Sequence, residues 1–404
     1  MLPHGGTGAV PGGYRGRMTG HLVTRMQPFG TTVFAEMTQR ALQFDAVNLG
    51  QGFPDTDGPE EMLELAARGL REGLNQYAPA RGLPVLREAV AEHQRRFYGI
   101  PLDADTEVLV TVGATEAIAA SLLALVEPGD EVVVIEPFYD SYAASVALAG
   151  GVRRTVPLRF PDLALDVDAL AAAVTDRTRV LLLNSPHNPT GKVFTRAELE
   201  AVARVAVERD LLVISDEVYE HLVFDGLEHI PVATLPGMAE RTLTISSVGK
   251  TFSLTGWKTG WVSGPAPLVA AVAGVKQFLT FVGVTHLQPA VAHGLRMPDA
   301  FFTGLADQLQ SRRDVLVGAL ADVGVPVSPC QGTYFVIADL AGHGVTDAVD
   351  FCRRLPEEVG VVGVPVSVFC DDPAPVASLV RFAFCKKEEV LREAARRLRS
   401  LARR

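Results

Sequence analysis

The chain is poor in cysteine. Its 404 residues include only Cys330, Cys352, Cys370 and Cys385. These four stand far apart and form no C-x-x-C pair, so neither a zinc ribbon nor a redox dithiol is indicated. We therefore expect a protein of a reducing compartment, the cytoplasm.

Long hydrophobic runs are missing as well. Nowhere do about 18 apolar residues follow one another, the length that a membrane-spanning helix needs. The opening stretch "MLPHGGTGAVPGGYRGRMTGH" lacks the apolar core of a signal peptide, and its glycines are not followed by the Lys-Ser/Thr of a P-loop. Residues 1–25 are expected to form a flexible leader, and no membrane span is predicted.

Positive charge is in deficit, with 37 Lys and Arg against 47 Asp and Glu and a formal net charge of -10. Nucleic-acid binding needs a basic surface, so a nucleic-acid partner is not expected. The one basic run, "LREAARRLRSLARR", ends the chain. Its helical spacing places Leu391, Ala395, Leu398 and Leu401 on one face and predicts a docked final helix.

The chain has the composition of a globular protein, and part of it shows a repeating sequence pattern. Hydrophobic residues make up 48% and charged residues 21%, and the length allows two or three domains. From residue 108 to 264, apolar β-rich runs alternate with helical patterns. Such runs are typical of strands buried on both faces, so a three-layer α/β/α fold with a mostly parallel sheet is predicted. The runs are "EVLVTVG", "EVVVIEP", "RVLLLNSP", "LLVISDEVY", "TLTISSVG" and "GWVSGP".

The texture changes after about residue 300. A long helical pattern is followed by the strand-like "TYFVIADL", a second helix, "SLVRFAFC" and the terminal helix. This order predicts a smaller α+β domain over residues 298–404, beside a large domain over residues 53–297. Residues 26–52 are too few for a domain and are expected to pack on the small one.

Polar side chains follow three of the predicted strands. Asn188 comes after "RVLLL", Asp216 and Tyr219 after "LLVIS", and Ser247 and Lys250 after "TLTI". In open α/β sheets the ligand lies beyond the carboxyl ends of the strands, so these side chains are expected to converge on one ligand.

This set of side chains suits a pyridine cofactor better than a metal ion or a Ser-His-Asp triad. An ionised Asp216 would keep a ring nitrogen protonated and so make the ring an electron sink. Tyr219 and Asn188 would hydrogen-bond a ring oxygen. Lys250, desolvated near a cationic ring, would have a lowered pKa and could form a Schiff base.

From about Pro28 to its C-terminus, the sequence resembles the fold-type I, class I and II aminotransferases that use pyridoxal 5'-phosphate (PLP). It is most similar to the branch that holds kynurenine aminotransferase / cysteine-S-conjugate β-lyase, methionine aminotransferase and actinobacterial N-succinyldiaminopimelate aminotransferase. The motifs that carry the resemblance are "VNLGQGFPD", "NQYAPARGLPVLREA", "VTVGATEAI", "EPFYDSY", "NSPHNPTG", "SDEVYEHL", "SSVGKTFSLTGWKTGW" and "VRFAFCK".

The resemblance implies a role for each matching residue. Lys250 would bind the cofactor covalently and move the Cα proton, and Arg381 would grip the substrate α-carboxylate, which the backbone at Gly52 would approach. Tyr139 matches the aromatic residue that stacks on the ring, where many relatives carry Phe. The residues implied for the phosphate are Ala114, Thr115, Ser247 and Lys258, with Tyr77 from a neighbouring subunit.

The expected protein is thus a homodimeric PLP-dependent aminotransferase that acts on an L-amino acid and a 2-oxo acid. A pocket wall of Phe34, Tyr139 and the partner subunit's Phe281 would favour aromatic or long apolar donors such as kynurenine, methionine, glutamine or phenylalanine. N-succinyl-LL-2,6-diaminopimelate is the runner-up, with Arg81 as a candidate for its distal carboxylate.

Other interpretations stay open at this point. One is β-elimination from cysteine conjugates, and a remote one is a PLP-binding transcription regulator, which would carry a basic DNA-binding module that this acidic chain lacks. His187 and His221 stand in no metal-ligand spacing and are expected to be structural. Cys385 is expected to be a small buried hydrophobe.

Overall fold

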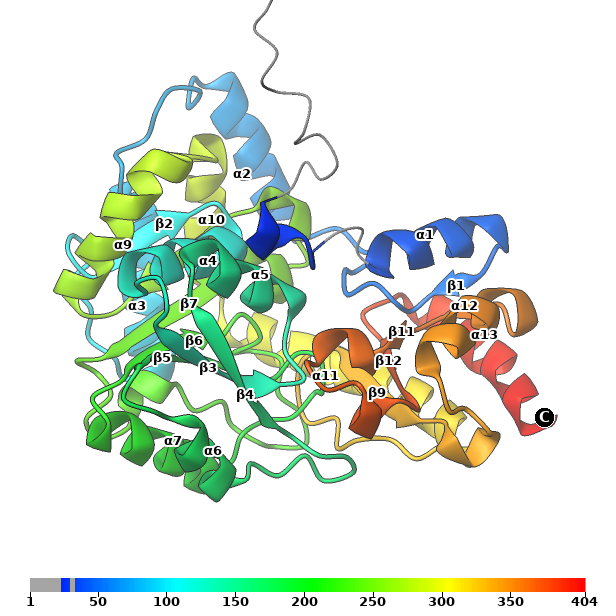
Figure 1. Cartoon of the computed structure of the whole chain (residues 1–404). Coiled ribbons are helices and arrows are strands. Elements are labelled where there is room, and N and C mark those ends of the chain that lie inside the picture. The colour runs from blue at the N-terminus through cyan, green and yellow to red at the C-terminus, as the bar shows by residue number, and fades with distance from the viewer. Residues whose placement is uncertain (1–22, 30–32, 404) are drawn as a thin grey trace, which may run out of the picture.

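A computed structural model describes residues 23–29 and 33–403 (Figure 1). Most of the predicted leader lies outside these residues. The larger part of the structure is built on a seven-stranded sheet in the order β2-β8-β7-β6-β5-β3-β4. Strands β4, β3, β5, β6 and β7 run parallel, and β8 is antiparallel to both β7 and β2. The strands are β2 (Val108–Thr111), β3 (Glu131–Glu136), β4 (Val152–Pro157), β5 (Thr178–Asn184), β6 (Leu212–Asp216), β7 (Thr242–Ser247) and β8 (Gly260–Ser263).

Helices cover both faces of this sheet, which confirms the predicted three-layer α/β/α fold. In β5, Leu181 and Leu183 pack with α6 and α7, whereas Val180 and Leu182 pack with α4, α5 and α9 on the opposite face. This alternation follows from the two-residue period of a strand and explains why β5 is apolar at every position from 180 to 183. These helices are α4 (Gly113–Leu125), α5 (Asp140–Ala149), α6 (Val167–Ala173), α7 (Arg196–Glu208) and α9 (Ala266–Leu279).

Strand β4 was not among the predicted runs. Its sequence is "VRRTVP". Exposed and half-buried residues alternate over its first four positions, which include Arg153 and Arg154, because the strand forms an edge of the sheet. Edge strands with charged side chains lack the continuous apolar signal of central strands. At the other edge, three helices pack on β2 and β8 through a separate cluster: α2 (Glu60–Arg71), α3 (Pro84–Tyr98) and α10 (Gln288–Leu295).

The C-terminal part of the chain forms a second, smaller lobe beside the sheet (Figure 1). It contains the antiparallel sheet β11-β12-β9 and three helices. The last helix buries Leu391, Ala395 and Leu398, and Leu401 is buried beyond it, as the sequence predicted. The elements are β9 (Phe335–Asp339), β11 (Val364–Pro365), β12 (Leu379–Ala383), α11 (Asp299–Ala321), α12 (Ala348–Glu358) and α13 (Glu388–Leu398).

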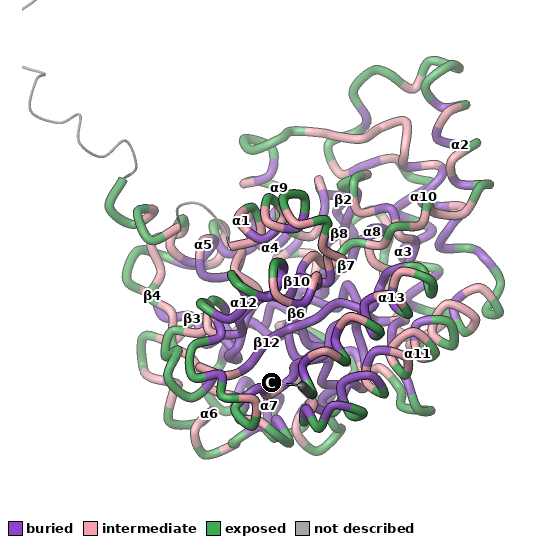
Figure 2. Tube along the Cα trace, turned by 90° about the vertical axis from the view of Figure 1, so that its right-hand side faces the viewer, coloured by how far each residue is buried: buried purple, intermediate pink, exposed green. Residues whose placement is uncertain are grey.

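Helix α1 (Val33–Gln43) and strand β1 (Val47–Asn48) pack on this smaller lobe. Helix α1 buries Met37 and Ala41 in the same apolar cluster as α12 and α13. Strand β1 pairs in parallel with β10 (Val361–Val362). From α1 onward, the described chain runs from the smaller lobe into the large sheet and back, whereas the turn Thr24–Met26 before α1 contacts α5 of the larger part. The purple stretches of Figure 2 mark the buried strands and inner helix faces.

Short helical turns complete the described residues. One of them, α8 (Val248–Thr251), follows β7 directly. Within the described ranges, no helix is both long and apolar enough to cross a membrane. The 3-10 turns are η1 (Thr24–Met26), η2 (Val232–Thr234), η3 (Thr255–Trp257), η4 (Thr285–Leu287), η5 (Ala341–His343), η6 (Val366–Phe369), η7 (Ala374–Val376) and η8 (Arg399–Arg403).

Candidate active site

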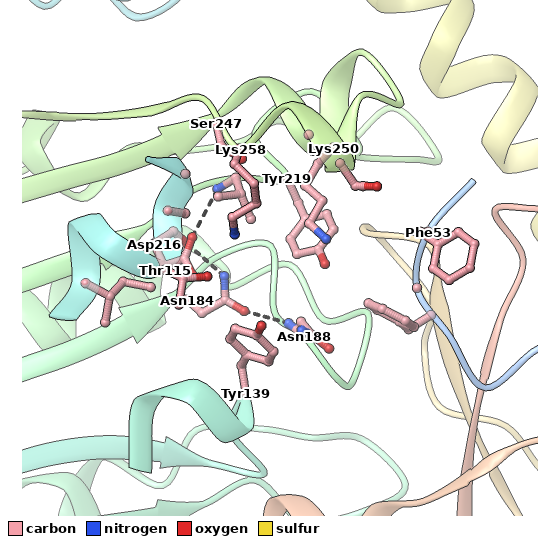
Figure 3. Close-up of a pocket in the computed structure, with 18 of the residues that line it drawn as sticks. Phe53, Thr115, Tyr139, Asn184, Asn188, Asp216, Tyr219, Ser247, Lys250 and Lys258 are labelled. Carbon is pink, nitrogen blue, oxygen red and sulfur yellow. Dashed lines mark hydrogen bonds between the residues drawn. The ribbon is translucent and has the colours of Figure 1, made fainter. Parts of the chain in front are cut away.

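A cavity of about 400 Å³ lies beyond the carboxyl ends of β5, β6 and β7, between the sheet and the smaller lobe (Figure 3). The three strands are parallel neighbours, so their last residues, Asn184, Asp216 and Ser247, come to one edge of the sheet. All the candidate residues named from the sequence line this cavity except Tyr77 and Phe281, and Arg81 does not line it either.

Asp216 lies at the bottom of the cavity with 4% of its surface exposed. Its Oδ2 accepts a hydrogen bond of 2.5 Å from the hydroxyl of Tyr142, and its backbone carbonyl accepts one of 2.8 Å from the Asn184 side chain. Burial raises the pKa of the Asp216 carboxyl to about 6, although the Tyr142 hydrogen bond opposes the rise. The carboxyl is thus fixed in position and is best stabilised as an anion by a buried cation.

Lys250 reaches the cavity from α8, near Tyr219 (Figure 3). Its Nζ donates a hydrogen bond of 3.0 Å to the hydroxyl of Tyr334. That hydroxyl in turn donates to the carbonyl oxygen of Gly52 at 2.6 Å. Burial lowers the pKa of Lys250 to about 8, so a substantial fraction of the amine is neutral near physiological pH and can act as a nucleophile.

The opposite end of the cavity is shaped for an anion. Gly113, Ala114 and Thr115 begin α4 there, and the first amides of a helix have no partners within the helix. Ser247 and Lys258 line the same cavity. A phosphate-sized group would therefore meet backbone amides, hydroxyls and one ammonium group.

Two glycines, Gly113 and Gly260, keep this part of the cavity open, because their backbones pack directly against each other. A Cβ atom on Gly260 of β8 would lie 2.7 Å from the carbonyl carbon of Gly113 and 2.9 Å from the Ala114 nitrogen. Gly113 itself has a φ of +73°, and a Cβ there would lie 3.2 Å from the Lys258 Nζ. Only glycine at both positions allows the first turn of α4 to sit against β8 with Lys258 beside it.

Arg381 enters the cavity from β12 and is 2% exposed. Its Nη1 donates to Asn188 Oδ1 at 3.1 Å and its Nη2 to the Gly50 carbonyl at 2.9 Å, whereas Nε has no hydrogen-bond partner among the described residues. The rings of Phe335 and Phe369 lie 4.1 and 4.8 Å from the guanidinium. Burial lowers the pKa of Arg381 to about 10, and both of these hydrogen bonds go to uncharged oxygens. A buried guanidinium of this kind is suited to an anionic ligand.

Gly52, Phe34 and Tyr139 also line the cavity. The backbone at residue 52 passes so close to the ring of Phe335 that only glycine fits there, because a Cβ atom would lie 2.3 Å from that ring. The ring of Phe34 lies 5.4 Å from the Arg381 guanidinium. Tyr139 ends the connection after β3, directly before α5.

Tyr77 and Phe281 are not part of this cavity. Tyr77 is 80% exposed and Phe281 is 41% exposed, and the two rings contact each other edge to face at 5.2 Å. The Arg81 guanidinium donates to the carbonyl of Thr106 at 3.1 Å.

Three functional candidates were missed by sequence reasoning. Tyr142 and Asn184 stand inside the quoted motifs "EPFYDSY" and "NSPHNPTG", so their motifs were available as a signal. Tyr334 had no such signal, because its contact with Lys250 joins residues that are 84 positions apart.

Of the other residues singled out in the sequence, His187 and Cys385 are buried and His221 is half-buried. His187 Nδ1 lies 2.8 Å from the Thr190 hydroxyl, and burial lowers the pKa of His187 to about 3. Cys385 is fully buried in the apolar cluster of the smaller lobe, and burial raises the pKa of its thiol to about 11.

The donor set fits PLP. A buried carboxylate suits a pyridinium nitrogen, an amine of lowered pKa suits an aldehyde carbon, and the open start of α4 suits a phosphate. A fully buried Arg with an unpartnered Nε suits the carboxylate of an amino acid. Fold and cavity together define a PLP-dependent transferase.

Comparison with known proteins gives the family. The sequence profile of the family described as aminotransferase class I and II matches residues 45–398. A probable N-succinyldiaminopimelate aminotransferase of Mycobacterium tuberculosis is 54% identical over 393 residues, which cover 95% of this chain and 99% of that protein. The methionine aminotransferase of Escherichia coli is 43% identical over 378 residues, with 94% and 98% covered. A kynurenine--oxoglutarate transaminase of Dictyostelium discoideum is 38% identical, with 91% and 93% covered.

Solved structures agree with these matches. N-succinyldiaminopimelate aminotransferase from Mycobacterium tuberculosis superimposes with a TM-score of 0.92, covering 94% of this chain and all of that one at 54% identity. A methionine aminotransferase from Escherichia coli superimposes with a TM-score of 0.91, covering 94% and 99% at 43% identity. The chain belongs to the class I and II aminotransferases. It is a PLP-dependent enzyme that moves an amino group between an amino acid and a 2-oxo acid.

Proposed function

We propose that the preferred amino donors are L-amino acids with an aromatic or long apolar side chain, of the kynurenine, methionine, glutamine or phenylalanine type. The observation that carries this proposal is the setting of Arg381, whose buried guanidinium is enclosed by Phe34, Phe335 and Phe369. A substrate α-carboxylate bound there would leave the side chain among aromatic rings, with Phe53 also lining the cavity. Such a surface gains from apolar contact area.

We propose the following division of work among the residues of the cavity. Lys250 binds the cofactor and takes and returns the proton at the substrate Cα, for which its lowered pKa is suited. Asp216, held by Tyr142, pairs with the pyridinium nitrogen, and PLP supplies the electron sink for charge that develops at Cα. Tyr219 and Asn188 bind the ring oxygen.

The phosphate would be bound at the start of α4. There the free amides and the helix dipole favour an anion, and Lys258 adds a charge. We further propose that Tyr139 stacks on the cofactor ring and that the backbone at Gly52 meets the substrate carboxylate. The residues proposed for the phosphate are Ala114, Thr115, Ser247 and Lys258.

A second candidate donor is N-succinyl-LL-2,6-diaminopimelate. The relative that favours it is the Mycobacterium tuberculosis protein at 54% identity. This substrate has a distal carboxylate that requires another cation, and the cations lining the cavity within the described residues are Lys250, Lys258 and Arg381. Arg81 of a neighbouring subunit would have to supply it.

We also propose that the enzyme is a homodimer with shared active sites, located in the cytoplasm. Tyr77 and Phe281 support the dimer, because two large rings stand together at the surface and not in the cavity of their own chain. In the dimer, Tyr77 would reach the phosphate of the other subunit, and Phe281 would complete its substrate pocket. The free state of all four cysteines is consistent with a reducing compartment.

Steady-state kinetics with 2-oxoglutarate as acceptor test the choice of donor. We expect kcat/KM for kynurenine, phenylalanine or methionine to exceed that for the succinylated diaminopimelate by tenfold or more. The opposite ranking would favour the second candidate, and Arg81→Gln should then lower kcat/KM for the succinylated donor alone. Sedimentation of the holoenzyme as a monomer would refute the shared active sites.

A further inference from the structure

A second group of chemically active side chains lies outside the cofactor cavity. His93 belongs to α3, and Glu220 and His221 directly follow Tyr219 after β6. The Nε2 atoms of the two histidines are 2.9 Å apart, and Oε2 of Glu220 lies 3.9 Å from His93 Nε2. The three ligand atoms all lie within 4.8 Å of one another. None of these residues lines the cavity that holds Lys250.

The proton position on His93 can be inferred from its second nitrogen. His93 Nδ1 lies 3.3 Å from the backbone carbonyl of Leu295, which can only accept a hydrogen bond. In the neutral ring, the single proton then sits on Nδ1, where it can be donated to this carbonyl. Its Nε2 therefore presents a lone pair toward His221 and Glu220. A backbone carbonyl that fixes the far N–H is also how proteins orient histidines that bind metal ions.

Glu220 contributes a second lone pair without a donor. Its Oε1 accepts a hydrogen bond of 2.7 Å from the Ser246 hydroxyl. Its Oε2 is buried and has no hydrogen-bond partner within the described residues, and only 5% of the residue is exposed. An unpartnered carboxylate oxygen in a protein interior is costly unless a cation compensates it.

Among the described residues, no charged side chain provides that cation. The buried phenol of Tyr98 interacts with the Glu220 carboxylate, and burial together with this carboxylate raises the pKa of the phenol, but this group is uncharged. Aromatic rings enclose the two imidazoles, with His93 4.6 Å from Phe97 and His221 4.4 Å from Phe302 between ring centroids. Arg96 lies over the Phe97 ring, but its guanidinium is already paired with Asp299.

The group thus combines a nitrogen lone pair and a carboxylate oxygen in an apolar shell. His221 Nε2, which donates its hydrogen to His93 in the absence of an ion, becomes a further ligand when the His221 proton moves to Nδ1.

We propose that His93, Glu220 and His221 form a binding site for one divalent transition-metal ion, with Zn²⁺ as the fitting ion and water as a fourth ligand. Two imidazoles and a carboxylate are a common zinc ligand set. Tetrahedral bonds of about 2.0–2.1 Å place ligand atoms about 3.3 Å apart. Two of the present separations, 2.9 and 3.9 Å, lie on either side of that value, and the third is within 4.8 Å, so the side chains must move closer together around an ion.

The ion would tie two distant parts of the chain together. His93 and His221 are 128 positions apart, and His221 lies two residues beyond Tyr219 of the active site. A bound ion would hold the segment after β6 against α3 and so stabilise the loop that carries Asp216 and Tyr219. Its role would be structural, since the ligands are separate from the cofactor cavity.

The test uses the holoenzyme after treatment with a chelator. Titration with Co²⁺, followed in the visible range beyond the cofactor band, and metal analysis after loading with Zn²⁺ should both give one ion per chain. Zn²⁺ should raise the Tm by a few degrees, since a ligand that binds only the folded state stabilises it. His293→Gln is the matched control, because His293 is a partly exposed histidine that pairs with Glu61 elsewhere.

Two variants decide the assignment. His93→Gln keeps a polar side chain, and Glu220→Gln keeps nearly the same shape, and we expect each to weaken metal binding at least tenfold and to abolish the Tm shift. His293→Gln should bind like the unaltered protein. Failure of the unaltered holoenzyme to take up one ion per chain would overturn the proposal, and so would equal binding by His93→Gln and Glu220→Gln. Neither result depends on which amino acid the enzyme prefers.

Discussion

The hydroxyl of Tyr334 lies 3.0 Å from Lys250 Nζ and 2.6 Å from the carbonyl oxygen of Gly52, so one phenol connects the reactive amine to the loop on which the substrate carboxylate is proposed to bind. Tyr334 comes from the segment just before β9 of the smaller lobe, whereas Lys250 belongs to the large sheet. The contact therefore depends on how the two lobes pack together.

Tyr334→Phe should lower kcat about tenfold. The variant loses the hydrogen bond that Lys250 donates to the hydroxyl, and such a bond from a charged group contributes about 1.5 kcal/mol to holding the amine in place. Cofactor occupancy, measured from the absorbance of the purified protein, should stay unchanged. Kinetics with a saturating amino donor check the first expectation. A kcat within twofold of the unaltered enzyme would show that this hydroxyl does not position the amine.

Attachment of PLP to the cofactor-free protein should depend on pH through Lys250. The neutral amine is the nucleophile, and burial lowers the pKa of this amine to about 8. The attachment rate should therefore rise with pH up to about 8 and level off above it. Stopped-flow absorbance over this range provides the measurement, and Lys250→Arg serves as the control that cannot attach the cofactor. A rate that kept rising well above pH 9 would indicate an ordinary lysine.

Asp216→Asn should stabilise the cofactor-free protein while it impairs the enzyme. Burial raises the pKa of this carboxyl from 3.8 to about 6, so the unfolded chain ionises first and stability falls as pH rises between about 4 and 6. With a shift of about two units, the loss above pH 6 is about 3 kcal/mol. An asparagine side chain avoids this loss of stability and can still accept the hydrogen bond from Tyr142.

Urea unfolding of the cofactor-free proteins at pH 4 and pH 8 measures this effect. The variant should be more stable at pH 8, and the difference should vanish toward pH 4. Its kcat should fall at least 100-fold, because the pyridinium loses its anionic partner. If the difference in stability between the variant and the unaltered protein were the same at pH 4 and at pH 8, the assigned pKa shift would be contradicted.

Arg381→Lys tests the proposed carboxylate site without changing the net charge. Lysine cannot donate two parallel hydrogen bonds, nor can it donate at once to Asn188, to Gly50 and to a substrate. We expect kcat/KM to fall roughly 10- to 100-fold, about 1.4 to 2.7 kcal/mol. The loss should be similar for every amino donor, since all share the α-carboxylate. A loss confined to one donor would instead indicate contact with a side chain.

Much of the large sheet could be predicted from the sequence, because β3, β5, β6 and β7 are buried on both faces and the first three are largely apolar. Strand β4 could not, since two adjacent arginines, Arg153 and Arg154, interrupt its apolar residues at an edge of the sheet. The convergence of Asn188, Asp216 and Lys250 followed from the rule that parallel strands end at one edge. By contrast, the contact of Lys250 with Tyr334 depends on the packing between lobes, which no local pattern encodes.

The roles of Arg381 and Tyr77 came from resemblance and not from their local patterns. An arginine in an apolar strand is equally compatible with a structural ion pair, and only its position in the cavity, with an unpartnered Nε, makes a ligand role chemically specific. The group of His93, Glu220 and His221 was not predicted either. Its two histidines are 128 positions apart, and no local pattern shows that they meet.

The pairing of β1 with β10 has a consequence for synthesis on the ribosome. Val47 leaves the exit tunnel more than three hundred residues before Val361, its partner. At about 5–20 residues per second, α1 and β1 wait roughly 15 to 60 s with Met37, Ala41 and Leu49 uncovered. During this interval, nascent chains carry an apolar helix face and an unpaired strand edge near their N-terminus. Premature termination would leave both permanently exposed, so truncated products should be preferred clients of chaperones and proteases.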